Sequence, residues 1–143
     1  MTALPKTLRV VKRWLVKAEQ DLRVAEHILD LKTDCPFDFV CFHAQQCAEK
    51  YLKALLALHR IPFGKTHDLT ELALLIPGNA KAALSKLRLA ELNPYAVEAR
   101  YPGEGDEANG GDALQALRIT RQIRDLVRAE LPQDVPTEKN SGK

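Results

Sequence analysis

Residues 37–60 read FDFVCFHAQQCAEKYLKALLALHR, and this stretch decides the fold. An α-helix turns by about 100° per residue, and at that angle the apolar side chains of the stretch share one stripe. The stripe consists of Phe37, Val40, Cys41, Ala44, Ala48, Tyr51, Leu52 and Leu55. A narrow polar strip lies on the far side and consists of His43, Gln46, Lys50 and Lys53. The pattern predicts a core helix with one chemically distinct face.

The polar strip is the strongest candidate for chemistry or recognition. A histidine such as His43 can exchange a proton near neutral pH, and Gln46 can both donate and accept hydrogen bonds. The two lysines could hold a phosphate. A solvated face would explain the same residues, because Gln and Lys are usually at the surface. Phe42 lies in the same sector, and an aromatic beside polar anchors is typical of an interface, here the seam of a homodimer.

Apolar periodicity predicts four more helices, over residues 8–30, 69–76, 81–92 and 113–131. Prolines and glycines separate these segments, and no strand-like alternation occurs between them. Asp68, followed by Glu71, is predicted to cap the short helix over 69–76, and Asp112 the last helix. The fold class is therefore all-α, an up-and-down helical bundle of four long helices plus a short accessory helix.

The chain of 143 residues is long enough for one domain with a buried core. We assign residues 1–131 to the bundle and predict that the polar, proline-containing residues 132–143 form a disordered tail. The formal net charge of +2 is too small for nucleic-acid binding by bulk charge, so any basic surface must come from local clustering.

The three cysteines, Cys35, Cys41 and Cys47, indicate neither a disulfide framework nor a zinc site, because they are odd in number and lack ligand spacing. We predict no metal site and no cofactor. No apolar run reaches the ~18 residues of a membrane span, and no signal-peptide pattern begins the chain. We therefore expect a cytoplasmic protein without membrane contact.

Asp21 projects from within the apolar stripe of the helix over residues 8–30. A carboxylate there needs a partner unless it lies at a solvated edge. Two interpretations remain: an edge position, or a carboxylate that orients a cation in a buried polar cluster. Arg100, which could clamp a carboxylate or phosphate, would be such a partner if its segment folds back on the bundle. A purely structural ion pair would explain Arg100 equally well.

Two further groups of residues have competing explanations. His67 and Asp68 could form a catalytic base with its orienting carboxylate, but we favour Asp68 as a cap and His67 as structural. Arg118, Arg121, Arg124 and Arg128 form a row on the last helix that could track phosphates. Pairing with acidic neighbours, such as Arg121 with Asp125, explains the row without a ligand.

Four segments in combination resemble the HEPN family (higher eukaryotes and prokaryotes nucleotide-binding domain). They are KAEQDL at 17–22, FHAQQCAEKYLKA at 42–54, THDL at 66–69 and RYP at 100–102. The resemblance implies a helical bundle that usually homodimerises. Small stand-alone members often accompany a minimal nucleotidyltransferase, as in a toxin–antitoxin module, and fused members help to bind nucleotide or substrate.

Many HEPN members are metal-independent endoribonucleases with an Arg-x(4–6)-His motif near the start of the last long helix, paired across the dimer. This chain has no histidine after Arg100. The one literal match, Arg60 to His67, falls in the loop after the helix over 37–60, so we do not carry the catalytic roles over.

The expected function is thus a binding module: a homodimer that partners a minimal nucleotidyltransferase, binds nucleotide or RNA, or does both. The alternative is a metal-independent endoribonuclease with His43 or His67 acting alongside Arg100. The candidate ligand-binding residues are His43, Gln46, Lys50, Lys53, Arg100 and Tyr101. Asp21 and Asp68 are assigned to a structural polar cluster.

Overall fold

The computed structural model describes residues 4–97, 107–132 and 135, and every regular element in these ranges is helical. Three helices are long: α1 (Pro5–Leu29), α2 (Phe37–Leu58) and α5 (Gly110–Glu130). The others are the short helices α3 (Leu69–Leu74) and α4 (Gly78–Leu84) and the 3-10 turns η1 (Leu89–Glu91) and η2 (Asn93–Ala96). The predicted all-α bundle is confirmed.

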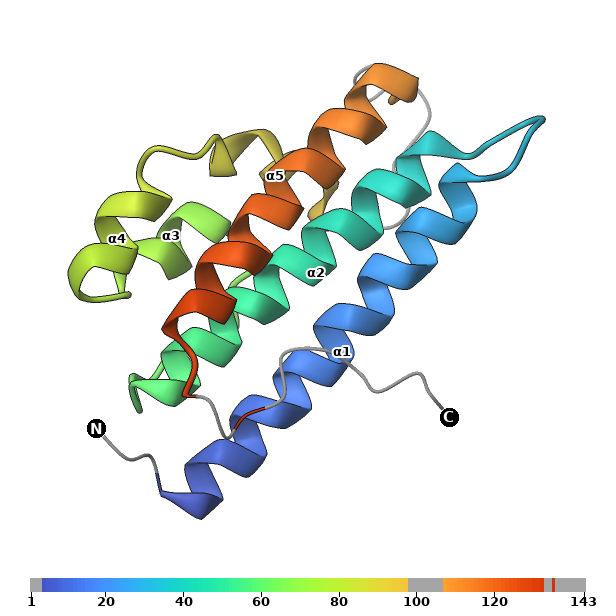
Figure 1. The fold of residues 1–143 in the computed structure, drawn as a ribbon. Helices are drawn as coiled ribbons and strands as arrows, with labels where there is room; N and C mark the ends of the chain where they lie inside the picture. The colour runs from blue at the N-terminus through green and yellow to red at the C-terminus, as the bar shows by residue number, and fades with distance from the viewer. Residues whose placement is uncertain (1–3, 98–106, 133–134, 136–143) are drawn as a thin grey trace.

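Helix α2 is the central element, and both α1 and α5 pack along it (Figure 1). Helix α1 runs antiparallel to α2, whereas α5 runs in the same direction as α2. The short elements α3, α4, η1 and η2 lie on the side of the bundle away from α1 and return the chain toward the start of α5. Both neighbours of α2 can therefore supply partners to its polar side chains.

The predicted helix over residues 81–92 is wrong in length, so the described chain has three long helices instead of four. Helix α4 ends at Leu84, and the chain resumes as the 3-10 turn η1 at Leu89. Leu84 and Leu89 are both buried, yet on one straight helix they would point about 140° apart. Burial of both leucines overrides the local helix propensity.

The predicted caps have mixed outcomes. Asp68 is the N-cap of α3, and its carboxylate accepts hydrogen bonds from the backbone N–H groups of Thr70 and Glu71, as predicted. Asp112 is not the N-cap of α5. Asn109 is, and Asp112 stands at the third helical position of a reciprocal capping box. The capping box satisfies backbone N–H groups at the start of α5, so the helix can begin with two glycines despite their poor helix propensity.

Helix α2 ends in a reversal that uses Arg60 in the left-handed conformation, with φ of 58°. The backbone N–H groups of Arg60 and Ile61 donate to the carbonyls of Ala57 and Leu56, which is the Schellman pattern. Glycine is the residue usually found at this position, because a Cβ is strained at positive φ.

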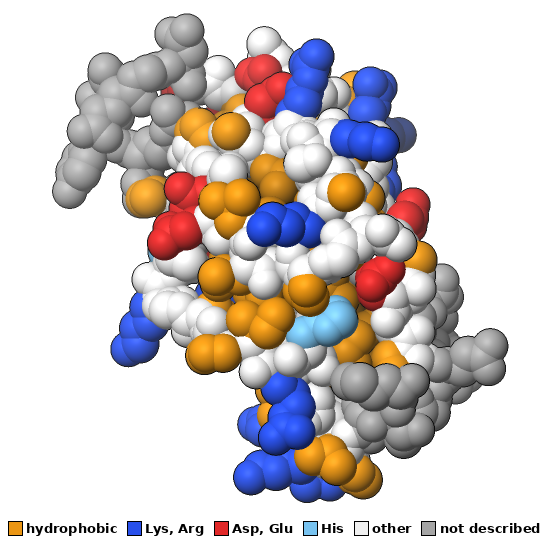
Figure 2. Space-filling model, turned by 90° about the vertical axis from the view of Figure 1, so that its left-hand side faces the viewer, with side chains coloured by type: hydrophobic (Ala, Val, Ile, Leu, Met, Phe, Trp, Pro, Cys, Tyr) orange, Lys and Arg blue, Asp and Glu red, His pale blue; other side chains and the backbone are white. Residues whose placement is uncertain are grey.

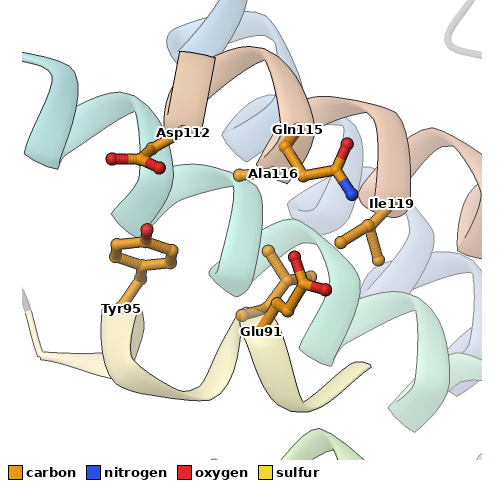
Figure 3. Close-up of a pocket in the computed structure, with 7 residues that line it drawn as sticks. Glu91, Tyr95, Asp112, Gln115, Ala116 and Ile119 are labelled. Carbon is orange, nitrogen blue, oxygen red and sulfur yellow. The ribbon is translucent and has the colours of Figure 1, made fainter. Parts of the chain in front are cut away.

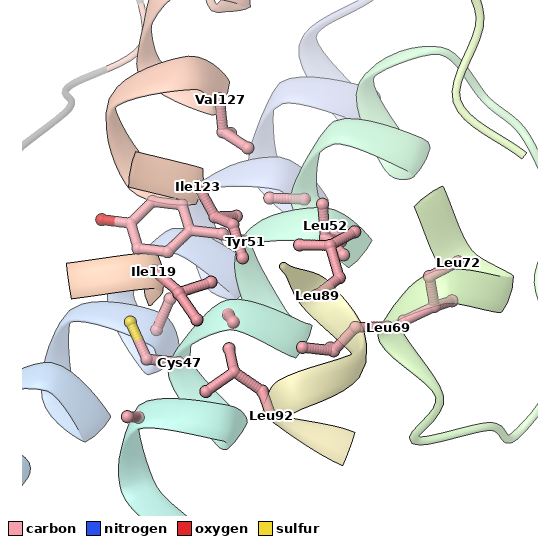
Figure 4. Close-up of a cluster of buried hydrophobic side chains, with 14 of the residues drawn as sticks. Cys47, Tyr51, Leu52, Leu69, Leu72, Leu89, Leu92, Ile119, Ile123 and Val127 are labelled. Atoms are coloured by element: carbon pink, nitrogen blue, oxygen red, sulfur yellow. The ribbon is translucent and has the colours of Figure 1, made fainter. Parts of the chain in front are cut away.

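The core is one cluster centred on α2 (Figure 4). Its labelled side chains come from α2, α3, the η1 region and α5: Cys47, Tyr51, Leu52, Leu69, Leu72, Leu89, Leu92, Ile119, Ile123 and Val127. Thr120 is also fully buried, and its hydroxyl donates to the carbonyl of Ala44 at 2.9 Å, joining α5 to α2. Of the predicted tail, only Pro132 and Val135 lie in the described residues, and Val135 is buried.

The face of the molecule that includes α3 and α4 mixes hydrophobic side chains with basic and acidic ones (Figure 2). Leu74 and Leu75 are exposed there, beside a groove of about 360 Å³ between α3, α4 and η1. Among the described residues, no helix combines the length and the apolar character needed to cross a bilayer.

Candidate functional site

Asp21 joins α1 to the polar strip of α2. One carboxylate oxygen lies 3.0 Å from Nδ1 of His43, and the other accepts a hydrogen bond from Nζ of Lys50. The three side chains are only 13–24% exposed, so this group lies half-buried in the seam between two helices. We call these three residues the Asp21 cluster.

The Asp21 cluster leaves groups free for a ligand. An ionised carboxylate only accepts hydrogen bonds, so His43 donates from Nδ1 and its Nε2 is left for another partner. The ammonium of Lys50 has three donors and gives one of them to Asp21. Phe42 packs edge-on against the His43 ring, with centroids 5.1 Å apart, and further restricts its orientation.

A second polar group lies along the same helix and is centred on Glu49. Its two carboxylate oxygens bind Nζ of Lys53 at 2.7 Å and Nδ1 of His67 at 2.9 Å. Gln45 is fully buried and donates from its amide to Glu49 and to the backbone carbonyl of His67. We call these four residues, Gln45, Glu49, Lys53 and His67, the Glu49 cluster. It ties α2 to the loop before α3.

Glu49 remains ionised because its partners outweigh its burial. Burial by itself raises the pKa of this carboxyl group. The hydrogen bonds and charges of Lys53 and His67 act more strongly in the opposite direction, and the net pKa lies below the ordinary value of 4.5. Lys53 in turn lies 5.6 Å from the ring centroids of both Trp14 and Phe63, in an aromatic pocket that suits a cation.

The polar strip is therefore divided between two clusters and is not a fully solvated face. His43 and Lys50 meet at Asp21, whereas Lys53 is buried in the Glu49 cluster. Gln46 is half-buried and donates to the side chain of Gln45, beside the Glu49 cluster. Asp68, which we had grouped with Asp21, instead belongs to the cap of α3, where Asn93 also donates to it.

Two arginines of the α5 row, Arg121 and Arg128, pair with α1, whereas Arg124 lies 3.8 Å from Asp125 of its own helix. Arg121 binds Glu26 at 2.6 Å, which corrects the predicted pairing with Asp125. Arg128 binds Glu19 at 3.4 Å, and Glu19 also accepts from the hydroxyl of the buried Tyr51. Acidic residues of a neighbouring helix thus satisfy part of the row without a ligand.

Arg100 and Tyr101 lie outside the described residues, so the contact of Arg100 with Asp21 and the ligand-binding role of both residues stay predictions. Arg60 is exposed at the end of α2, where its role is the backbone reversal described above. His67 is anchored by Glu49 through Nδ1, and its side chain is 65% exposed. Its Nε2 is therefore available at the surface.

Gln45 and Glu49 were not among the predicted site residues, although they are the most buried polar residues of the site. Their spacing carried a signal: Gln45, Glu49 and Lys53 follow one another at steps of four residues, the spacing of side chains that interact along a helix. No local pattern indicates the other partner of Glu49, because His67 is 18 positions away in the sequence.

The hollows described here are small or open to the surface. The hollow between η1, η2 and α5 is lined by Glu91, Tyr95, Asp112 and Gln115 (Figure 3) and holds only about 40 Å³. That is room for a few water molecules. A shallow groove of about 300 Å³ lies on α1, next to Trp14.

Buried cysteines contribute packing and no chemistry to the site. Burial, followed by the nearby carboxylates of Glu19 and Asp21, raises the pKa of the Cys47 thiol well above its usual range. A thiol of that kind is a poor nucleophile. The polar groups along this face are therefore the imidazole of His43 and the partly exposed ammonium of Lys50 on α2, and the imidazole of His67 from the loop before α3.

A profile of the HEPN domain matches residues 11–130 of the chain. Two solved structures are similar over most of their length. One, described as an archaeal HEPN homologue, ST0689, has 25% identity and a TM-score of 0.65, covering 84% of this chain and 96% of its own. The other, TT1696 from Thermus thermophilus, has 26% identity and a TM-score of 0.66, covering 85% of this chain and 98% of its own. The comparison with curated proteins found no match.

Proposed function

The chain belongs to the HEPN domain family, and from this premise we propose that it is a binding module that holds a nucleotide or RNA phosphate on the polar face of α2. One observation carries the proposal: Asp21 fixes His43 and Lys50 side by side while both remain partly exposed. An imidazole Nε2 and an ammonium with spare donors are groups that bind phosphate oxygens.

The charge balance of the α2 face indicates that it would select a ligand by hydrogen-bond geometry. Asp21 neutralises Lys50, and Glu49 neutralises Lys53, so neither cluster carries a large excess of positive charge. Binding would then depend on hydrogen-bond geometry more than on long-range attraction. We expect a modest salt dependence for a mononucleotide at this face.

Calorimetric titration with ATP tests the proposal. The Lys50→Met variant should bind ATP at least about tenfold more weakly, the equivalent of one charge-assisted hydrogen bond. Lys86→Met, which removes an exposed lysine beyond the end of α4, should bind ATP like the unaltered protein. Equal affinities in all three proteins would contradict a phosphate site on α2.

The module is proposed to act as a homodimer, as the family resemblance implies. Phe42 supports the α2 face as the seam, because it is a half-buried aromatic side chain on the same sector as the candidate site. Sedimentation should give a dimer for the unaltered chain and a monomer for Phe42→Glu. A chain that sediments as a monomer in both forms would argue against this assembly.

A minimal nucleotidyltransferase is the proposed protein partner, again from the resemblance. Such an enzyme encoded beside this chain should co-purify with it when the two are expressed together. Failure of the adjacent pair to associate at micromolar concentration would remove the partner from the proposal and leave ATP binding unaffected.

A second candidate function is a metal-independent endoribonuclease. It is favoured by His43 and His67. Nδ1 of each ring lies at hydrogen-bond distance from a carboxylate, and Nε2 has no partner within the described part of the chain, which is the arrangement of an oriented general base. RNA incubated with the protein in chelator should then be cleaved, and His43→Ala or His67→Ala should abolish the cleavage. Intact RNA across a pH series would remove this candidate.

A further inference from the structure

The N-terminal half of α1 carries a row of basic side chains that the proposed phosphate site does not use. Lys6, Arg9, Arg13 and Lys17 are all exposed. No carboxylate in the described ranges forms an ion pair with any of them, in contrast to Arg121 and Arg128 of α5. This is a local cluster of unneutralised charge in a chain whose formal net charge is only +2.

The row leads directly to the candidate site. Arg9, Arg13 and Lys17 follow one another at steps of four residues, and the next step along the same ridge of the helix is Asp21. Each step advances about 6 Å along the helix axis. Regularly spaced cations of this kind can contact successive phosphates of an extended chain, with the Asp21 cluster at the end of the ridge.

An aromatic side chain lies beside the row. Val10, Arg13, Trp14 and Lys17 line the groove of about 300 Å³ on α1. Trp14 is half-buried and packs edge-on against Phe63, with ring centroids 6.2 Å apart. Lys53 of the Glu49 cluster lies over the Trp14 ring. Trp14 thus connects the basic row to the polar face of α2.

We propose that Lys6, Arg9, Arg13 and Lys17 form a track for the sugar–phosphate backbone of a single-stranded nucleic acid, with Trp14 as a stacking surface for a base. The inference rests on the proposed function, because the track ends at the Asp21 cluster, and it names the ligand class more narrowly. A row of cations combined with an aromatic platform is the usual design of single-strand binding surfaces.

An acidic protein helix would also satisfy the charge of the row but would need an apolar seam along it. Val10 and Val16 are exposed in this part of α1, at 40% and 39%. At 100° per residue they lie on opposite flanks of the row, so they form no continuous seam. The groove beside Trp14 combines one aromatic ring with two cations, which suits a base and its phosphate better than an apolar helix face.

Anisotropy of a labelled twelve-nucleotide oligouridine tests the track at several salt concentrations. Arg13→Ala/Lys17→Ala should weaken oligouridine binding roughly tenfold and reduce the slope of log affinity against log salt by roughly 1.4. ATP binding at the α2 face should stay unchanged in this variant. The matched control is Lys81→Ala/Lys86→Ala, which removes two exposed charges from the α3–α4 side and should change neither measurement.

Intrinsic fluorescence supplies an independent readout, because Trp14 is the one tryptophan of the chain. Oligouridine should quench it if a base stacks on the ring. Quenching that is absent while the oligonucleotide binds would overturn the role of Trp14.

The remaining outcomes separate the track from the proposed function. If ATP binds but oligouridine does not, or if both double variants bind oligouridine like the unaltered protein, the track is wrong and the phosphate site stands. If neither ATP nor oligouridine binds, both proposals fail. If poly-glutamate displaces the oligonucleotide at equal charge concentration, the row is a surface for acidic protein and the nucleic-acid track is overturned.

Discussion

Glu49 and His67 are joined by a contact of 2.9 Å between a carboxylate oxygen and the ring Nδ1, across 18 positions of the sequence. The contact attaches the loop before α3 to the middle of α2. Because Glu49 also binds Lys53, one nearly buried carboxylate holds two side chains that the sequence places in different elements. The stability of this junction should depend on the charge of Glu49.

Glu49→Gln should therefore destabilise the fold by about 2 kcal/mol at neutral pH, since it removes the charge from two hydrogen bonds in a buried position. Urea unfolding measures the change. The control Glu91→Gln removes an exposed carboxylate that pairs only with Arg88 at the surface, and should shift stability by less than about 0.5 kcal/mol. Equal effects of the two variants would contradict the importance of the Glu49 cluster.

The stability difference between the unaltered protein and Glu49→Gln should depend on pH, and the pKa of Glu49 sets the direction of the change. The folded pKa of Glu49 lies below its ordinary value of 4.5, so the folded state binds fewer protons than the unfolded state in that range. The contribution of Glu49 is then fully present above about pH 5 and is lost as the pH falls through the folded pKa. The stability gap between the unaltered protein and Glu49→Gln should shrink with acidification, and a gap that widens would contradict the assignment.

A double-mutant cycle on Asp21 and Lys50 should give a coupling free energy of about 1 kcal/mol, because their ion pair is half-buried and shared with His43. The variants are Asp21→Asn, Lys50→Met and their combination, compared by urea unfolding. A parallel cycle on Glu26 and Arg121, whose side chains are 42% and 43% exposed, should give less than about 0.5 kcal/mol. Identical couplings would indicate that burial of the Asp21 cluster has no energetic effect.

Arg60→Gly should stabilise the protein by about 0.5–1 kcal/mol, because Arg60 holds φ at 58°, where a Cβ is strained. Thermal unfolding is the appropriate measurement. His59→Gly serves as the control: His59 has φ of −85°, so glycine there relieves nothing and should lower the melting temperature. A lower melting temperature in Arg60→Gly would show that the side chain contributes more than its backbone strain costs.

Thiol labelling should separate the three cysteines. Cys41 and Cys47 are fully buried, and burial raises the pKa of Cys47, whereas Cys35 is partly exposed and donates its S–H to the carbonyl of Ile28. We expect one thiol to react in the native protein, none in Cys35→Ser, and three after unfolding of the unaltered protein. Rapid reaction of two or more native thiols would mean that the core around α2 opens readily.

Local patterns were sufficient where a single helix carried the information. The apolar stripe of residues 37–60 predicted α2, and Asp68 followed by a short apolar run predicted the cap of α3. The helix predicted over 81–92 failed because Leu84 and Leu89 are both buried, whereas one straight helix would point them about 140° apart. A local pattern does not contain that requirement. The cap predicted at Asp112 is at Asn109, because the side chains of these two residues form a capping box around the two glycines between them.

The amino-acid sequence alone determined that the chain is helical, that α2 is its centre, and that His43 and Lys50 share one face of that helix. Helical periodicity fixes these relations, since residues three and four apart are neighbours whatever the rest of the chain does. Only the tertiary structure decided that Asp21 of α1 joins His43 to Lys50, and that His67 meets Glu49. Such partners are chosen by helix packing, because a half-buried charge must be satisfied by whichever opposite charge the folded chain brings within reach.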